Sequence, residues 1–464
     1  MLQFIPQNLD LDQVLLDHPP CFKCEKDYLI HILHLLTEIP ANNKDLLEND
    51  YVPLYSVILQ SRIRNYRECL NYLIERNIIQ TDNHYIVNEV SRGYKFSPLY
   101  QTPCRETSIE KYTLIKGIRE HQWHQNRPAE QKHHVLRQFF NEKLLIDHAG
   151  AIAFLQQSYQ TNTENNVKNA IGKYNSGILQ VARFRDQNFF FHVDGTVNRL
   201  HSNLTTCASG LRNFLTYEGH ALVSVDLRNS QPYLSLQLFT PEFWADSLST
   251  TNVSNPFTLF NISPQYYSKI VSTKSNNIML VNTLFSKDST GFADVKTFRE
   301  KVLAGTLYEY IAEELTNRHV AVFKTRNQLK AMIFMVMFSV NRFIGQKDAE
   351  PKRIFRELFP NVYSVFKAIK RHGSNNLPII LQRMESRLML DCVARRILKE
   401  KPGMPIYTIH DSIVCPEGQQ GYVAHVIHDE CSKHLRVQPN LHYEFWRPRT
   451  EVQVQQEEHT VHAA

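Results

Sequence analysis

The segment that most constrains the fold of this chain is an apolar run that ends abruptly at an acid. In Ala221–Leu236, ALVSVDLRNSQPYLSL, the residues before Asp226 are typical of a buried strand, and Asp226 falls where that strand should end. A carboxylate at this place is costly to desolvate unless it meets a cation or hydrogen-bond donors. Asp226 is therefore either a metal ligand or the cap of a helix that begins near Ser230, because Asp favours helix starts.

A second segment of the same kind lies far downstream, at Pro405–Cys415, PIYTIHDSIVC. It again interrupts an apolar β pattern with an acid, Asp411. Two acids at the ends of two buried strands can share one site, because paired carboxylates are the ligands that hard divalent cations prefer. The second segment therefore favours the metal interpretation of Asp226 over the helix cap.

The third informative segment, Thr325–Gln346, is typical of a helix, and four of its residues recur every four positions on one face: Arg326, Lys330, Phe334 and Phe338. Two cations followed by two aromatic rings suit a nucleoside triphosphate, with the cations on phosphate oxygens and the rings beside the base and sugar. The alternative is a buried helix whose two cations reach solvent at one end, since its central turns are wholly apolar.

Composition limits the class of protein. The 464 residues are 42% hydrophobic, enough for a substantial core and roughly two to four structural units. The sequence has no apolar run long enough to cross a bilayer and no signal-peptide pattern, so we expect a cytoplasmic protein without a membrane partner. The net charge of +6 permits binding to a polyanion. Eight cysteines, with Cys21 and Cys24 as a lone CxxC, predict no disulfide framework.

In order, these segments resemble the polymerase module of family A DNA polymerases, the bacterial polymerase I type, and the related single-subunit phage RNA polymerases. The resemblance covers roughly residues 190–450. Asn198–Ser202, NRLHS, resembles the TGRLSS block that holds the primer-template, with Arg199 in the place of its arginine. Asp226 begins the equivalent of motif A, DYSQIE in many of these enzymes.

Two further blocks extend the resemblance. The helical face described above fits the RxxxKxxxFxxxY pattern of the motif B helix. The segment His410–Ser412 aligns with motif C, usually HDE in the DNA enzymes and HDS in the phage RNA enzymes. Just before it, LQRMESR resembles the helix whose glutamine faces the nascent duplex, which makes Gln382 a candidate contact. Candidate nucleic-acid contacts are thus Arg199, Arg212, Gln382 and His410, where Arg212 belongs to a polar stretch suited to phosphates and sugars.

The resemblance implies a two-metal mechanism of nucleotidyl transfer. Asp226 and Asp411 would hold two Mg²⁺ ions, for which Mn²⁺ can substitute, with the backbone carbonyl of Leu227 as a further ligand. Arg326 and Lys330 would stabilise charge on the phosphates, and Lys330 would also donate a proton to the leaving group. Phe334 and Phe338 would position the incoming nucleotide, while a primer-template, most simply of DNA, supplies base identity.

Two departures from the family pattern bear on the sugar. Gln231 replaces the glutamate that crowds the 2′ position, and we interpret it as a steric gate that favours deoxyribonucleotides. Phe338 replaces a tyrosine whose hydroxyl helps to distinguish ribose from deoxyribose. The first prediction is therefore a DNA polymerase. The alternatives are an RNA polymerase or ribonucleotide-tolerant polymerase, which Ser412 and Phe338 support, and a non-catalytic nucleic-acid-binding protein with a polymerase fold.

We expect an α+β fold of the right-hand polymerase type, with an antiparallel sheet in the palm and helical fingers and thumb. No proofreading is expected, because residues 1–105 are too few for the exonuclease of this family and lack its acidic cluster. A compact polymerase of this kind suits replication in a phage or mobile element. The predicted regions are a helical N-terminal module, with a possible winged helix, at 1–105, a thumb at 106–188, palm at 189–254 and 373–450, fingers at 255–372 and a flexible tail at 451–464.

Overall fold

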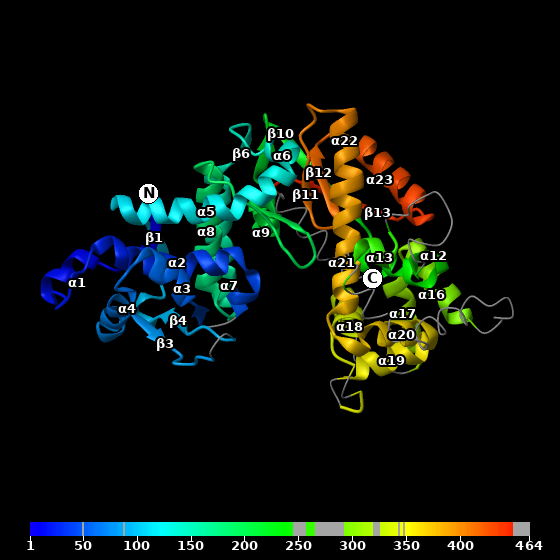
Figure 1. Cartoon of the computed structure of the whole chain (residues 1–464), viewed down its shortest axis with the longest axis horizontal. Coiled ribbons are helices and arrows are strands. Elements are labelled where there is room, and N and C mark those ends of the chain that lie inside the picture. The colour runs from blue at the N-terminus through cyan, green and yellow to red at the C-terminus, as the bar shows by residue number, and fades with distance from the viewer. Residues whose placement is uncertain are drawn as a thin grey trace. The chain divides into compact units, whose positions relative to one another are not determined.

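The computed structural model describes residues 1–48, 51–86, 89–244, 257–263, 265, 292–318, 325–341, 344–346 and 349–448. The chain divides into two compact units (Figure 1). The first comprises residues 1–192, 201–222 and 445–464, and the second comprises residues 193–200 and 223–444. The predicted fingers region falls partly outside the described residues, and the predicted tail at 451–464 falls wholly outside them.

The first unit opens with helices and a small antiparallel sheet. Helix α4 (Tyr66–Glu75) buries Cys69, Leu70 and Leu73 on one face, as its amphipathic pattern predicts. In the sequence the amphipathic pattern that begins at Tyr66 continues to Ile79, YRECLNYLIERNII, but the helix ends four residues earlier because Asn77 adopts a positive φ of 53° and the chain then enters a strand. That strand, β3 (Ile79–Thr81), pairs antiparallel with β4 (Gly93–Phe96), and β2 (Val52–Pro53) pairs with the other side of β4.

A helix followed by antiparallel strands is thus present within the predicted module at 1–105, and its interpretation as a winged helix remains a prediction. The other elements of this first part are β1 (Leu2–Pro6), α1 (Leu11–Asp17), α2 (Lys26–Asn42), η1 (Lys44–Glu48), α3 (Ser56–Arg62), η2 (Pro98–Tyr100) and β5 (Cys104–Ser108). Strands β1 and β5 pair antiparallel, which joins the two ends of the module.

The region from 106 to 188 is mainly helical after the end of β5 at Ser108. Helices α7 (His148–Glu164) and α8 (Ala170–Arg185) pack closely, because Gly177 of α8 leaves room for Leu155 of α7; a Cβ at this glycine would lie 2.4 Å from the leucine. The remaining elements of the unit are α5 (Tyr112–Lys132), α6 (His134–Arg137), β6 (Leu144–Ile146), α9 (Asn203–Thr206), α10 (Ser209–Arg212) and β9 (Leu215–Tyr217). Strands with residues in both units are β7 (Phe191–Val193), β8 (Leu200–Ser202), β10 (His220–Leu227) and β13 (Leu441–Trp446).

The sheet of the second unit is built around the last part of β10. This strand lies between β12 (Ser412–Pro416) and β13, and β12 pairs antiparallel with β11 (Tyr407–Ile409). The sequence pattern predicted one strand broken at Asp411. The structure instead forms a hairpin there, in which His410, with a φ of 53°, and Asp411 connect the two strands.

Helices surround this sheet, and a cluster of phenylalanine rings packs several of them together, with Phe298 in contact with Phe355, Phe359 and Phe366. In Figure 1, α21 and α22 form one long rod beside β11, β12 and α23. The described helices are α11 (Ser230–Ser235), η3 (Leu236–Phe239), α12 (Pro241–Trp244), α13 (Leu259–Ile262), α16 (Ala293–Ala304), α17 (Leu307–Asn317), α18 (Arg326–Phe338), α19 (Glu350–Leu358), α20 (Pro360–Ile369), η5 (Lys370–His372), α21 (Asn376–Ser386), the π-helical η6 (Arg387–Ala394), α22 (Arg395–Glu400) and α23 (Gln420–Leu435).

The predicted class is confirmed at the level of a mixed helical and sheet protein with antiparallel strands. Among the helices that the structure describes, none has both the length and the apolar character required to span a membrane.

Candidate active site

Asp226 and Asp411 lie next to each other in the second unit. Asp226 is near the end of β10, and the N–H of the next residue, Leu227, donates to the backbone carbonyl of Asp411 at 3.2 Å. The Asp226 carboxylate accepts a hydrogen bond from Ser224 Oγ at 2.8 Å, and Nδ1 of His442, on β13, lies 3.8 Å from it. The two acids that the sequence predicted at strand ends therefore lie beside each other, and they form one wall of the pocket described below.

The electrostatics of this wall favour a cation. Burial raises the pKa of Asp226 above its usual range, and the negative charge of Asp411 raises it further, while hydrogen bonds from Ser224 and Ser412 partly offset both effects. The helix-cap interpretation of Asp226 is wrong, because the residue that precedes α11 is Asn229, in the left-handed conformation at φ 55°. Asp226 therefore does not cap α11.

The acids face a pocket of about 630 Å³. Helix α18 supplies another part of its lining. Gln231, the predicted steric gate, and most of the predicted nucleic-acid contacts also line it. The sequence-predicted residues that line it are Arg199, Asp226, Leu227, Gln231, Arg326, Lys330, Phe334, Phe338, Gln382, His410 and Asp411.

Helix α18 presents its predicted face to this pocket. It begins with a capping box in which Thr325 and Gln328 exchange hydrogen bonds. Its buried face consists of other residues, Leu329, Met332, Ile333, Val336 and Met337, while Arg326 and Lys330 are exposed and Phe334 and Phe338 are half-buried. One face of the helix is thus buried, as the alternative interpretation expects, while the cations and rings occupy the side that the core leaves open.

The cations of α18 are held by neighbouring groups. The Arg326 guanidinium lies 5.1 Å from the ring centre of Tyr308 and 3.4 Å from the carboxylate of Glu309, both on α17. Lys330 Nζ lies 5.7 Å from the ring centre of Phe334, whose ring is 5.1 Å from that of Phe338. Tyr308 also lines the pocket, and the sequence pattern of α18 gave no sign of it.

Two buried lysines fix the last turn of α18. Lys370 Nζ donates to the carbonyl oxygens of Val336 at 2.6 Å and Ser339 at 3.0 Å, and Lys352 donates to the carbonyl of Val340. Burial lowers the pKa of Lys370 to about 8, and the charge of Lys352 adds to the effect. These lysines satisfy carbonyl groups that have no partner within a helix end. Sequence reasoning missed both, since they come from later helices.

The floor of the pocket contains a buried carboxylate that the sequence did not reveal. Glu385, on α21, is 1% exposed and accepts two hydrogen bonds on Oε1 from Arg199, from Nε at 2.9 Å and from a terminal nitrogen at 2.5 Å. Its Oε2 accepts from Gln231 Nε2 at 2.5 Å. Burial raises the pKa of Glu385 to about 7, although the Arg199 charge acts in the opposite direction.

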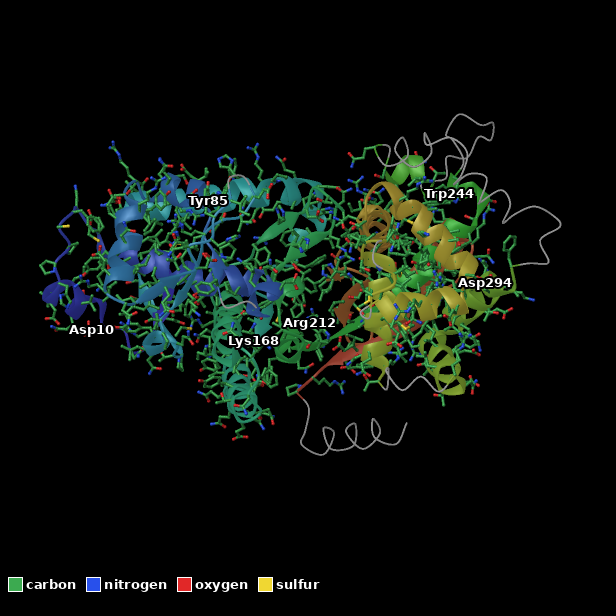
Figure 2. The ribbon with its side chains drawn as sticks, turned by 90° about the horizontal axis from the view of Figure 1, so that it is seen from below. Asp10, Tyr85, Lys168, Arg212, Trp244 and Asp294 are labelled. Atoms are coloured by element: carbon green, nitrogen blue, oxygen red, sulfur yellow. The ribbon has the colours of Figure 1, made fainter. Side chains whose placement is uncertain are left out.

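One predicted nucleic-acid contact lies elsewhere. Arg212, labelled in Figure 2, is on α10 of the first unit, where its guanidinium lies 5.7 Å from the ring centre of Trp446. It is absent from the lining of the pocket that contains the two acids. The structure therefore brings together every predicted site residue except Arg212.

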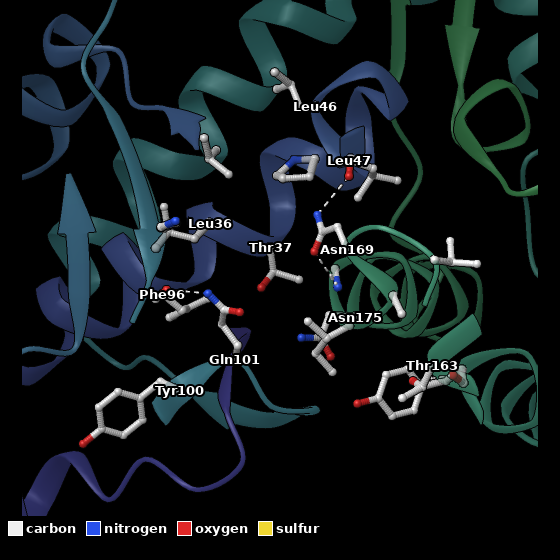
Figure 3. A pocket seen from close by; sticks show the side chains of 18 of the residues that line it. Leu36, Thr37, Leu46, Leu47, Phe96, Tyr100, Gln101, Thr163, Asn169 and Asn175 are labelled. Atoms are coloured by element: carbon white, nitrogen blue, oxygen red, sulfur yellow. Dashed lines mark hydrogen bonds between the residues drawn. The ribbon is translucent and has the colours of Figure 1, made fainter. Parts of the chain in front are cut away.

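A separate pocket, of about 600 Å³, lies in the first unit and was not predicted from the sequence (Figure 3). It lies between α2, α7 and the start of α8, and Lys95 is the charged residue among those that line it. Asn169 spans one side, because its side chain accepts from the N–H of Gly172 and donates to the carbonyl of Leu47. Asn175 bonds both Thr102 and Cys104, so its amide is already satisfied.

Comparisons with known proteins leave the family of the chain undecided. The sequence matches no protein-family model and no curated protein. Among solved structures, the chain is similar to the POL domain of Pol1 from M. smegmatis in complex with DNA primer-template and dNTP, with 10% identity and a TM-score of 0.29 over 72% of this chain and 73% of that chain. A TM-score this low carries no argument for the fold or the activity of this chain.

Proposed function

We propose that this protein catalyses template-directed nucleotidyl transfer, as a DNA polymerase of the family A type. The observation that carries the proposal is one pocket in which Asp226 and Asp411 form one wall and the cations and rings of α18 line another part. Acids for a divalent cation, cations for a triphosphate and rings for a nucleoside are the groups that this reaction requires.

The donor set fits divalent cations. Asp226 and Asp411 are adjacent carboxylates, and the charge of Asp411 raises the pKa of Asp226, a repulsion that a bound cation removes. Together with the carbonyl of Leu227 they would hold Mg²⁺, or Mn²⁺ in its place. Two such ions supply an activated primer hydroxyl and neutralisation of the triphosphate and its leaving pyrophosphate.

The side chains of the pocket do the remaining work. Arg326 and Lys330 bind phosphate oxygens and stabilise the charge that develops on them, and Lys330 donates a proton to the leaving group. Phe334 and Phe338 pack beside the nucleoside. Arg199, Gln382 and His410 contact the primer-template, and Arg212 is a further candidate for such a contact. The duplex is bound through its backbone and shape, because the template determines the sequence.

In this proposal the sheet with Asp226 and Asp411 belongs to the palm, at 189–254 and 373–450. The helices with α18 belong to the fingers, at 255–372, and the helices α5 to α8 belong to the thumb, at 106–188. The mainly helical region at 1–105 is a separate N-terminal module. The setting that suits such an enzyme is replication in a phage or mobile element.

One observation favours a second candidate, a polymerase that accepts ribonucleotides. Ionised Glu385 only accepts hydrogen bonds, so the group of Gln231 that meets it is the donating Nε2. Gln231 Oε1 is then left buried without a hydrogen-bond partner among the described residues. An acceptor at this place suits a hydroxyl of the incoming sugar, whereas a gate that only excludes the 2′-hydroxyl would need no acceptor. Phe338 also favours this candidate, because it lacks the tyrosine hydroxyl that helps to distinguish ribose from deoxyribose.

Primer extension tests these proposals. Labelled primers on DNA and RNA templates are incubated with Mg²⁺ and either dNTPs or NTPs, with wild type, Asp411→Ala and an exposed control, Lys367→Ala. Extension with dNTPs alone supports the DNA polymerase, and extension with NTPs supports the second candidate. Both must fail with Asp411→Ala and persist in the control. Duplex binding without extension by the wild type would overturn both proposals and identify a non-catalytic binding protein.

A further inference from the structure

A π-helical segment brings a cysteine against a helix that presents a glutamate and a histidine. Between α21 and α22 the rod is π-helical over Arg387–Ala394, and this segment contacts α23. Such segments are rare and often occur at functional sites. Cys392 lies on it, and Glu430 and His434 lie one helical turn apart on α23. All three belong to the second unit and lie outside the lining of the proposed polymerase pocket.

The three side chains converge closely enough to bind one ion. Their ligand atoms, the Cys392 sulfur, a Glu430 oxygen and a His434 ring nitrogen, all lie within 4.8 Å of one another. The His434 Nε2 to Glu430 Oε2 distance is 3.1 Å, close to the separation of two ligands of a tetrahedral ion with bonds of about 2.0 Å. Among the described residues this is the one group of this kind.

Neighbouring groups orient two of the ligands. Arg396 donates to Glu430 Oε1 at 3.0 Å, on the oxygen that does not face the histidine. Its guanidinium also bonds Asp429 and Glu400, so its charge is shared among several carboxylates. The His434 ring packs against Phe257 with ring centres 5.4 Å apart. A hydrogen bond that orients the carboxylate in this way is typical of the surroundings of metal sites.

We propose that Cys392, Glu430 and His434 form a zinc site. A set of one thiolate, one imidazole and one carboxylate suits Zn²⁺, whereas Mg²⁺ prefers oxygen ligands alone. Binding replaces the thiol proton, which leaves to solvent, with a zinc–sulfur bond. Three protein ligands leave one tetrahedral position for water or another ligand. Lys433 Nζ, 4.0 Å from Glu430 and on a 67% exposed side chain, can move away when the ion enters. The site is independent of the proposed polymerase function, since it shares no residue with it.

Cobalt(II) is the probe, because thiolate ligation gives it a charge-transfer absorption that oxygen and nitrogen ligation do not. The full chain is stripped with a chelator, desalted and titrated with Co²⁺, then with Zn²⁺. We expect one equivalent of Co²⁺ to produce the thiolate band and Zn²⁺ to abolish it. Cys392→Ser should remove the band, and His434→Gln should weaken Co²⁺ binding at least tenfold.

The matched control is Cys21→Ser, which changes an exposed cysteine of the CxxC pair and should leave the titration unchanged. Circular dichroism of each variant checks that it is folded. A second measurement is melting temperature, which Zn²⁺ should raise in wild type and Cys21→Ser but not in Cys392→Ser. A band that survives in Cys392→Ser, or folded wild type that binds no Co²⁺ stoichiometrically, would overturn the proposal.

Discussion

Gln231 donates through Nε2 to Oε2 of Glu385 at 2.5 Å, while Arg199 occupies the other oxygen of the same carboxylate. The carboxylate is 1% exposed, so water does not screen its charge, and Arg199 is its ionic partner among the described residues. Glu385 thus fixes two residues of the pocket at once. It orients the amide at the proposed sugar position and holds the arginine that is expected to meet the primer-template.

The first prediction concerns this ion pair. Arg199→Met should lower the free energy of unfolding at pH 9 by about 3 kcal/mol, because Glu385 with its pKa of about 7 is ionised there in wild type, and the variant leaves this buried charge unpaired. Urea denaturation of both proteins measures the difference. Arg199→Met with Glu385→Gln should recover most of the loss, since no buried charge then remains. A single-variant loss well below about 1 kcal/mol would show that the pair behaves like an exposed salt bridge.

The second prediction concerns pH. The pKa of Glu385 is raised from 4.5 to about 7 in the folded chain, so between these values the folded state binds more protons than the unfolded state. The stability that protonated Glu385 provides is present below pH 4.5 and lost as pH rises to about 7. Glu385→Gln lacks this group, and its stability relative to wild type should rise over that window by an amount on the order of 3 kcal/mol. If urea denaturation gave the two proteins the same dependence of stability on pH, the raised pKa of Glu385 would be contradicted.

Local patterns predicted those parts of the site that depend on strand ends and helical spacing. Asp226 and Asp411 could be placed together because each interrupts a buried β pattern, and the face of α18 follows from its four-residue repeat. The hairpin at His410 was missed because a short apolar run does not reveal a turn within it.

Other parts depend on tertiary contacts that no local pattern encodes. Glu385 and Lys370 look like ordinary charged residues in sequence, and only their burial beside Arg199 and the end of α18 gives them a role. Similarly, Asn229 precedes α11 in a left-handed conformation. The sequence did not predict this, because Asp226 is also a residue type that favours helix starts.

The third prediction separates stability from activity at the paired acids. Asp226→Asn removes a carboxylate whose pKa is raised by burial and by Asp411, so in the presence of a chelator it should be at least as stable as wild type, by up to about 1 kcal/mol. Primer extension should fall on the order of a thousandfold. Millimolar Mg²⁺ should raise the melting temperature of wild type but not of the variant. An equal rise in both would show that the ion binds elsewhere.

The fourth prediction tests whether Lys370 positions α18. Lys370→Met removes two hydrogen bonds to the carbonyls of Val336 and Ser339, leaving buried acceptors without partners, and should cost about 2 kcal/mol in the free energy of unfolding. If α18 binds the triphosphate, its displacement should raise KM for the nucleotide several-fold more than it lowers kcat. Lys367→Met, an exposed lysine one turn earlier, is the matched control and should change neither quantity.

The pH dependence of the stability difference between wild type and Lys370→Met distinguishes the effect of a buried charge from that of lost packing. In wild type the Lys370 pKa falls from 10.5 to about 8, so the folded state binds fewer protons than the unfolded state between these values. The stability of wild type relative to Lys370→Met should therefore increase as pH rises from about 8 to 10.5 and stay constant below about 8. A difference that does not change across this range would mean that Lys370 acts through its packing alone, because a lysine with an ordinary pKa gives no such slope.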